Sequence, residues 1–154
     1  MRKVFAGLAI LLMLAVVAQF FLAASGAFDT APNEESFQPH RALGYGIVLF
    51  AVLMTLVGAL ARVPGRLIGM TGLVAGLAVL QGVIRAIASA FGDTGDSTTA
   101  GQLVFGLHAV NGLVIMAAAG MIVRQARELS RSATPVRRAG TGDDARASEP
   151  AAPA

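Results

Sequence analysis

The 154-residue chain contains no cysteine, only two histidines and few charged residues. The absence of cysteine excludes disulfides, thiolate metal sites, cysteine nucleophiles and covalently attached c-type haem. Charged residues make up 14% of the chain, whereas soluble domains are about a quarter charged. Hydrophobic residues make up 55%, and the mean hydropathy is +0.69. This balance predicts an integral membrane protein.

The hydrophobic residues fall into four apolar blocks, at residues 4–24, 42–61, 67–91 and 103–123. Blocks of about 20 apolar residues are long enough to cross the hydrocarbon core of a bilayer. Each block must be helical, because an open strand in lipid would leave its backbone groups unpaired. We therefore predict an all-α fold, a transmembrane four-helix bundle over residues 1–128. Residues 129–154 are rich in Ser, Ala, Pro, Gly and charges, which predicts a disordered cytoplasmic tail.

The charged residues near the block ends predict the topology. The basic residues that fall on one side are Arg2, Lys3, Arg62, Arg66, Arg124, Arg127 and Arg131. The opposite loops carry the acidic residues Asp29, Glu34, Glu35, Asp93 and Asp96. The positive-inside rule then places both termini in the cytoplasm, in a multi-pass protein of the inner (cytoplasmic) membrane. The net charge of +3 reflects this orientation, and we predict no nucleic-acid partner.

The first block also has features of a signal peptide. It follows a basic start, and the small residues Ser25-Gly26-Ala27 are typical of a cleavage site after Ala27. Its apolar stretch of about 21 residues is longer than a usual signal-peptide core, which favours a retained helix.

The third block carries a stripe of glycines. They recur at intervals of four, three and four residues, at Gly65, Gly69, Gly72 and Gly76. Such small residues let a second helix approach closely, so the stripe predicts close helix packing, within the chain or in a homo- or hetero-oligomer.

Polar residues inside the apolar blocks form a second pattern. Counting about 1.5 Å of rise per residue from the basic ends places these residues at a similar depth in the outer leaflet. The predicted layer consists of Gln19, Tyr45, Gln81, Arg85, His108 and Asn111. No Asp or Glu lies within the blocks, so Arg85 needs a neutral acceptor, an acid in an outer loop or a bound anion. The layer is therefore either a hydrogen-bonded structural layer or a ligand pocket open toward the outer side. A proton path, which usually needs an intramembrane carboxylate, is a third alternative.

Two motifs carry a family resemblance. Residues 38–45 are QPHRALGY, and residues 106–115 are GLHAVNGLVI. The His-Arg-x-x-Gly and Leu-His-x-x-Asn patterns in them resemble an uncharacterised family of small four-span membrane proteins from actinobacteria. This resemblance covers about residues 1–128 and implies no established activity.

A more distant resemblance is to four-helix b-type cytochromes of the b561 kind. In both motifs a histidine is followed four residues later by glycine, as His40 by Gly44 and His108 by Gly112. The resemblance implies one b-type haem between the two histidines, with Arg41 or Arg85 near its propionates. Those cytochromes usually use four histidines for two haems, and this chain has one pair. Residue counting also places His40 about 9 Å nearer the outside than His108.

These observations leave three interpretations of function. The first is a structural or accessory membrane protein of unknown molecular activity, more simply non-enzymatic. The second is a redox protein with haem at His40 and His108, and the third is a carrier of a small anionic or quinone-like ligand at Arg85. We identify no catalytic residues, because no Ser-His-acid set lies at one depth. We also predict no metal-ion site, because two histidines without cysteine or an intramembrane carboxylate bind zinc weakly.

Overall fold

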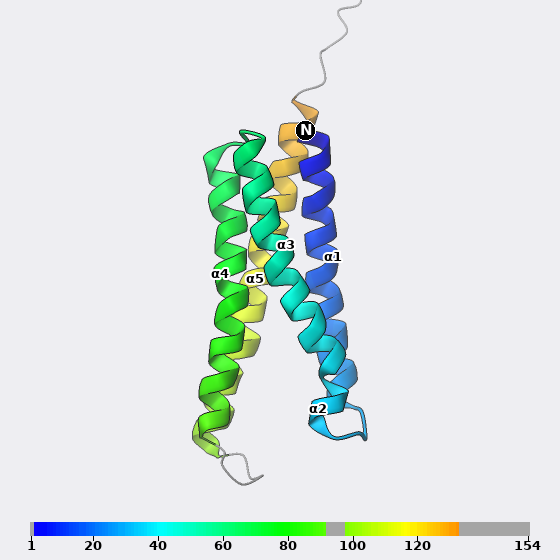
Figure 1. Cartoon of the computed structure of the whole chain (residues 1–154), viewed down its shortest axis with the longest axis vertical. Coiled ribbons are helices and arrows are strands. Elements are labelled where there is room, and N and C mark those ends of the chain that lie inside the picture. Colours follow the sequence, from blue (N-terminus) through cyan, green and yellow to red (C-terminus); the bar gives the residue numbers. More distant parts are fainter. Residues whose placement is uncertain (1, 92–97, 133–154) are drawn as a thin grey trace, which may run out of the picture.

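The computed structural model describes residues 2–91 and 98–132. Its described part consists of four long helices and one short helix (Figure 1). In chain order they are α1 (Arg2–Ala27), α2 (Asn33–Ser36), α3 (Gln38–Leu60), α4 (Gly65–Ala90) and α5 (Thr99–Arg131). The prediction of an all-α, four-helix fold is confirmed. Residues 133–154, most of the predicted tail, lie outside the described residues.

The four long helices are long and apolar enough to cross a membrane. Large apolar side chains also remain exposed along all of them, including Phe21, Leu49, Val79 and Leu113. A soluble protein would bury such residues, whereas a bilayer solvates them. The molecule is a multi-pass membrane protein whose apolar helices contact lipid.

The helices are longer than the apolar blocks that predicted them. α3 begins at Gln38 and has Pro39 in its first turn, where the missing N–H of proline is tolerated. His40 follows Pro39 directly and is therefore helical. α5 begins after Thr98, whose side-chain oxygen accepts a hydrogen bond from the Gly101 N–H at 3.1 Å.

Each long helix packs against two neighbours, in the cyclic order α1, α3, α4, α5. The pairs α1/α4 and α3/α5 are thus diagonal. α3 is inclined in this arrangement: it lies beside α4 at the end where α1 begins, and beside α1 at the end that carries α2 (Figure 1). We call the half of the bundle that contains the start of α1 and the end of α5 the basic half. The other half, which contains α2, is the histidine half.

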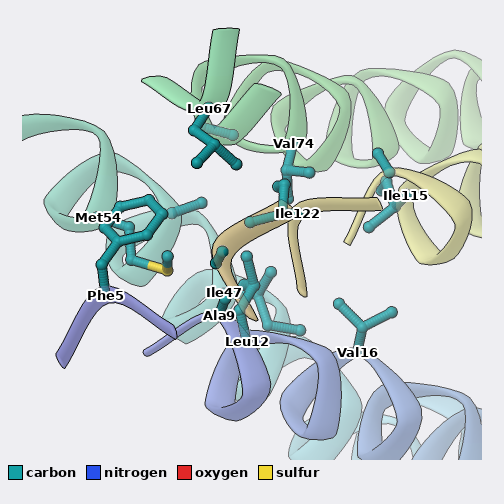
Figure 2. Packing of buried hydrophobic residues seen from close by; sticks show 14 of the residues in the cluster. Phe5, Ala9, Leu12, Val16, Ile47, Met54, Leu67, Val74, Ile115 and Ile122 are labelled. Atoms are coloured by element: carbon teal, nitrogen blue, oxygen red, sulfur yellow. The ribbon is translucent and has the colours of Figure 1, made fainter. Parts of the chain in front are cut away.

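Apolar packing is concentrated in the basic half and the middle of the bundle. Figure 2 shows Phe5 of α1 beside Met54 of α3 and Leu12 of α1 near Ile47 of α3, and Val16 also belongs to this core. Leu67, Val74, Ile115 and Ile122 complete this core from α4 and α5. In the histidine half, the buried positions are mostly small or polar, such as Gly26, Ser36, Gly101, Asn111 and Gly112. The two halves are therefore built differently.

The glycine stripe on α4 lies mainly on the outside of the bundle. A Cβ atom added at Gly65, Gly69 or Gly76 would meet no atom of the described residues within 4 Å. At Gly72 it would lie 3.8 Å from Thr55 of α3. Close packing by this stripe within the chain is therefore limited to Gly72, and an oligomer through it stays a prediction.

Candidate functional site: a histidine and glutamine cluster

Gln19 of α1 and His40 of α3 form a reciprocal pair. The Gln19 side-chain Nε2 donates to the His40 backbone oxygen at 2.8 Å. The His40 Nδ1 lies 3.1 Å from the Gln19 backbone oxygen. A carbonyl oxygen only accepts, so the ring proton is on Nδ1, and the Nε2 of a neutral His40 carries a free lone pair.

The structure brings the two histidines together across the bundle. The ring centres of His40 and His108 are 6.1 Å apart, and the ring planes are inclined by 47°. They come from the diagonal helices α3 and α5. Depth counting along straight helices had separated them by about 9 Å. The inclination of α3 explains the difference, because residues along an inclined helix change depth more slowly than the axial rise.

Aromatic rings line this cluster. Phe105 stacks on His108 with ring centres 5.2 Å apart and planes within 10°. Phe37 meets His40 edge-on at 6.2 Å. The two imidazole rings therefore lie between two phenyl rings.

The glycine that follows each histidine by four residues makes room for a neighbouring helix. A Cβ added at Gly44 would lie 3.1 Å from the Gln19 Nε2. A Cβ added at Gly112 would lie 3.2 Å from the Phe20 Cζ and 3.4 Å from the Gln81 Nε2. The Gln19 amide of α1 thus occupies the space next to Gly44, and the Gln81 amide of α4 lies next to Gly112.

Three buried polar atoms of this region have no hydrogen-bond partner among the described residues. They are Gln19 Oε1, Gln81 Oε1 and His108 Nδ1. Buried side-chain polar atoms are usually paired in proteins, so each exception needs a physical explanation. Their neighbour Asn111 follows the rule, because its Nδ2 donates to the Leu77 backbone oxygen at 2.8 Å.

The remaining predicted site residues lie elsewhere. Tyr45 does not lie in the cluster, because its side chain is 72% exposed on the outer face of α3. Arg85 is exposed on α4, and Arg41 donates to the backbone oxygen of Glu34 in α2. Counting had given the depth of Tyr45 and Arg85, but it does not give the side of the helix on which a residue lies.

Sequence analysis also missed several contributors. Phe20, Phe37 and Phe105 carry no polar atom that would mark them in the sequence, and only the structure shows their rings at the cluster. Nearer the middle of the bundle, Thr55 donates to Thr71 at 3.0 Å and so joins α3 to α4. Within the described residues, no group of three or more His, Cys, Asp or Glu side chains could hold a metal ion.

Comparison with known protein families finds a match. Residues 19–90 match a family of unknown function, DUF6220. The matched stretch includes Gln19, His40 and Gln81 and ends before His108. No curated protein and no solved structure matches the chain. These findings do not support the resemblance to b561-type cytochromes, and they show that the chain is similar, from α1 to α4, to an uncharacterised family.

Proposed function

We propose that the protein is a non-enzymatic accessory membrane protein whose histidine half binds a small ligand. The observation that carries this proposal is the group of partnerless buried atoms, Gln19 Oε1, Gln81 Oε1 and His108 Nδ1. An unsatisfied buried polar atom costs about 1–3 kcal/mol. These three atoms come from three different helices, and a bound ligand would give them partners.

A purely structural layer would satisfy its own polar atoms. Asn111 and Thr71 show what such bonding looks like in this bundle: both are buried, and both donate to a backbone oxygen. Gln19 Oε1, Gln81 Oε1 and His108 Nδ1 lack such a partner. The contrast favours a binding site over a structural layer.

The proposal predicts opposite effects for two neighbouring amides. Gln81→Met should raise the free energy of unfolding of the ligand-free protein by about 1–2 kcal/mol, because it removes an unsatisfied oxygen at similar volume. Asn111→Leu should lower it by a similar amount, because the Leu77 carbonyl loses its side-chain donor. Reversible unfolding of the full chain in mixed micelles measures both. A lower free energy of unfolding in both variants would show that Gln81 is structural and would contradict the proposal.

A single b-type haem is the second candidate, and one distance favours it. Two imidazoles on opposite sides of one metal ion, with metal–nitrogen bonds of about 2 Å, have ring centres about 6 Å apart. The 6.1 Å separation of His40 and His108 fits this value. His40 also directs its Nδ1 to a backbone carbonyl, as metal-bound histidines usually do.

The distance between the two histidines fits a haem, but the side chains around them fit it less well. The space beside Gly44 and Gly112 is taken by Gln19, Phe20 and Gln81, so a porphyrin would have to displace these side chains. Arg41 and Arg85 lie outside the cluster, and no observation places them near propionates. If haem binds, His40 and His108 would be its axial ligands, and it would supply one-electron transfer.

A visible spectrum tests the haem candidate. Protein purified from cells supplied with haem should show a Soret band that is lost in both His40→Ala and His108→Ala. Absence of the band in the wild-type protein removes the candidate. A band that survives His40→Ala excludes ligation by both histidines.

We also propose a topology in which α1 is retained and both termini are cytoplasmic. The start of α1, the α3–α4 connection and the end of α5 share one end of the bundle, and their basic residues therefore lie together (Figure 1). α1 supplies Phe5, Ala9, Leu12 and Val16 to the core, which supports its retention. An anionic ligand centred on Arg85 is not proposed, because Arg85 is exposed outside the cluster.

A further inference from the structure

We infer that the ligand of the histidine half is a neutral, lipid-soluble molecule of the hydroquinone class, a flat ring carrying two O–H donors. The inference rests on the proposed function and names the ligand class of the same site. Its basis is the kind of hydrogen-bonding atom that remains free in the cluster. Both free glutamine atoms are carbonyl oxygens, which only accept.

The histidines add further acceptors. The Nδ1 of His40 faces the Gln19 backbone oxygen, so the lone pair of a neutral ring is on Nε2. A neutral His108 has one ring nitrogen that accepts, whichever nitrogen carries the proton. The cluster therefore holds acceptors from α1, α3, α4 and α5.

Two of the amide donors of this region are already engaged. Gln19 Nε2 donates to His40, and Asn111 Nδ2 donates to Leu77. Gln81 Nε2 lies beside Gly112, 3.4 Å from the position of a Cβ added there. An anion, or a quinone with two carbonyl oxygens, offers only hydrogen-bond acceptors and could not pair with the acceptor atoms of the cluster. A ligand that carries O–H or N–H donors would pair with these atoms.

The surroundings favour a neutral flat molecule over a cation. No Asp or Glu lies within the apolar blocks to balance a positive charge, and an unbalanced charge is costly inside a membrane. Phe20, Phe37 and Phe105 contribute rings at the cluster, which suit an aromatic partner. The free oxygens come from α1 and α4, a diagonal pair, so a ring that pairs with both would need hydroxyl groups on opposite edges.

The test compares two probes that differ only in their donors. The probes are a short-alkyl 1,4-hydroquinone, kept reduced under argon, and its 1,4-dimethyl ether. Binding to the full chain in lipid nanodiscs is measured by calorimetry. The hydroquinone should bind at least about tenfold more tightly than the ether, since each lost hydrogen bond is worth about 1 kcal/mol. The Gln19→Met and Gln81→Met variants should each weaken hydroquinone binding by about fivefold, and the exposed-site control Arg85→Gln should leave it unchanged.

The outcomes separate this inference from the proposed function. Equal binding of the two probes overturns the donor requirement, and so does tighter binding of the corresponding quinone. If neither probe binds while Gln81→Met still stabilises the ligand-free protein, the ligand class is wrong and the binding site stands. If neither probe binds and Gln81→Met destabilises the protein, both proposals fail. The comparison of probes on the wild-type chain does not depend on any variant folding.

Discussion

Replacement of Phe5 by alanine should lower the free energy of unfolding by about 3–5 kcal/mol, the usual cost of deleting a buried aromatic ring. Phe5 is 2% exposed and lies in the core beside Met54 (Figure 2). Its ring also faces Gly58 of α3, where an added Cβ would lie 3.2 Å from the ring. The alanine variant would leave a cavity between α1 and α3 that neighbouring helices can fill only in part.

Phe21→Ala is the matched control on the same helix. Phe21 is 71% exposed on the surface that contacts lipid, so its removal should change the free energy of unfolding by less than about 1 kcal/mol. Unfolding of both variants in mixed micelles gives the comparison. An unchanged stability in Phe5→Ala would mean that α1 is absent from the mature protein, and it would contradict the packing of α1 in the bundle.

Replacement of Gly112 by valine should destabilise the protein by about 3 kcal/mol, near the upper end for overpacking. The added carbons would lie where Phe20 and Gln81 approach α5 most closely. Because the same side chains border the proposed binding site, this variant should also abolish ligand binding.

Gly106→Val provides the control for the helix itself. Gly106 lies on α5, and an added Cβ there would meet no atom of the described residues within 4 Å. Its replacement should change stability by less than about 1 kcal/mol, because valine has a somewhat higher helix propensity than glycine. A similar loss of stability in both valine variants would indicate a general effect on α5 and would count against a close approach at Gly112.

The fold could be predicted from the sequence because its determinants are local. Four apolar blocks of membrane-crossing length require helices, and short connections require neighbouring helices to be antiparallel. Pro39 suits the first turn of a helix, where α3 places it, and His40 follows it directly. The exact ends could not be predicted, since α5 begins at Thr99, before its apolar block does.

The candidate site could be predicted only in part, because it depends on helix rotation and inclination. Residue counting placed Gln19, Gln81 and His108 at one depth, and the structure brings both Gln19 and His108 next to His40. Counting gave the same depth to Tyr45, which faces outward, since depth carries no information on the direction of a side chain.

The sequence also does not show which glycines face a neighbouring helix. The regular stripe on α4 was the stronger sequence pattern, yet three of its four members face open space. Gly44 and Gly112, which lie outside that stripe, make the close approaches at the cluster. Spacing alone does not distinguish a glycine that contacts a neighbouring helix from one that faces lipid.

The most direct test of a ligand in the histidine half is the mass of the full chain when it is released intact from its own membranes. Native mass spectrometry should find wild-type protein heavier than its polypeptide by one small molecule, and the same added mass on Gly106→Val. The Gly112→Val variant should appear at the mass of the polypeptide alone. Wild-type protein that carries no added mass, or an added mass that persists in Gly112→Val, would contradict a ligand bound at this cluster.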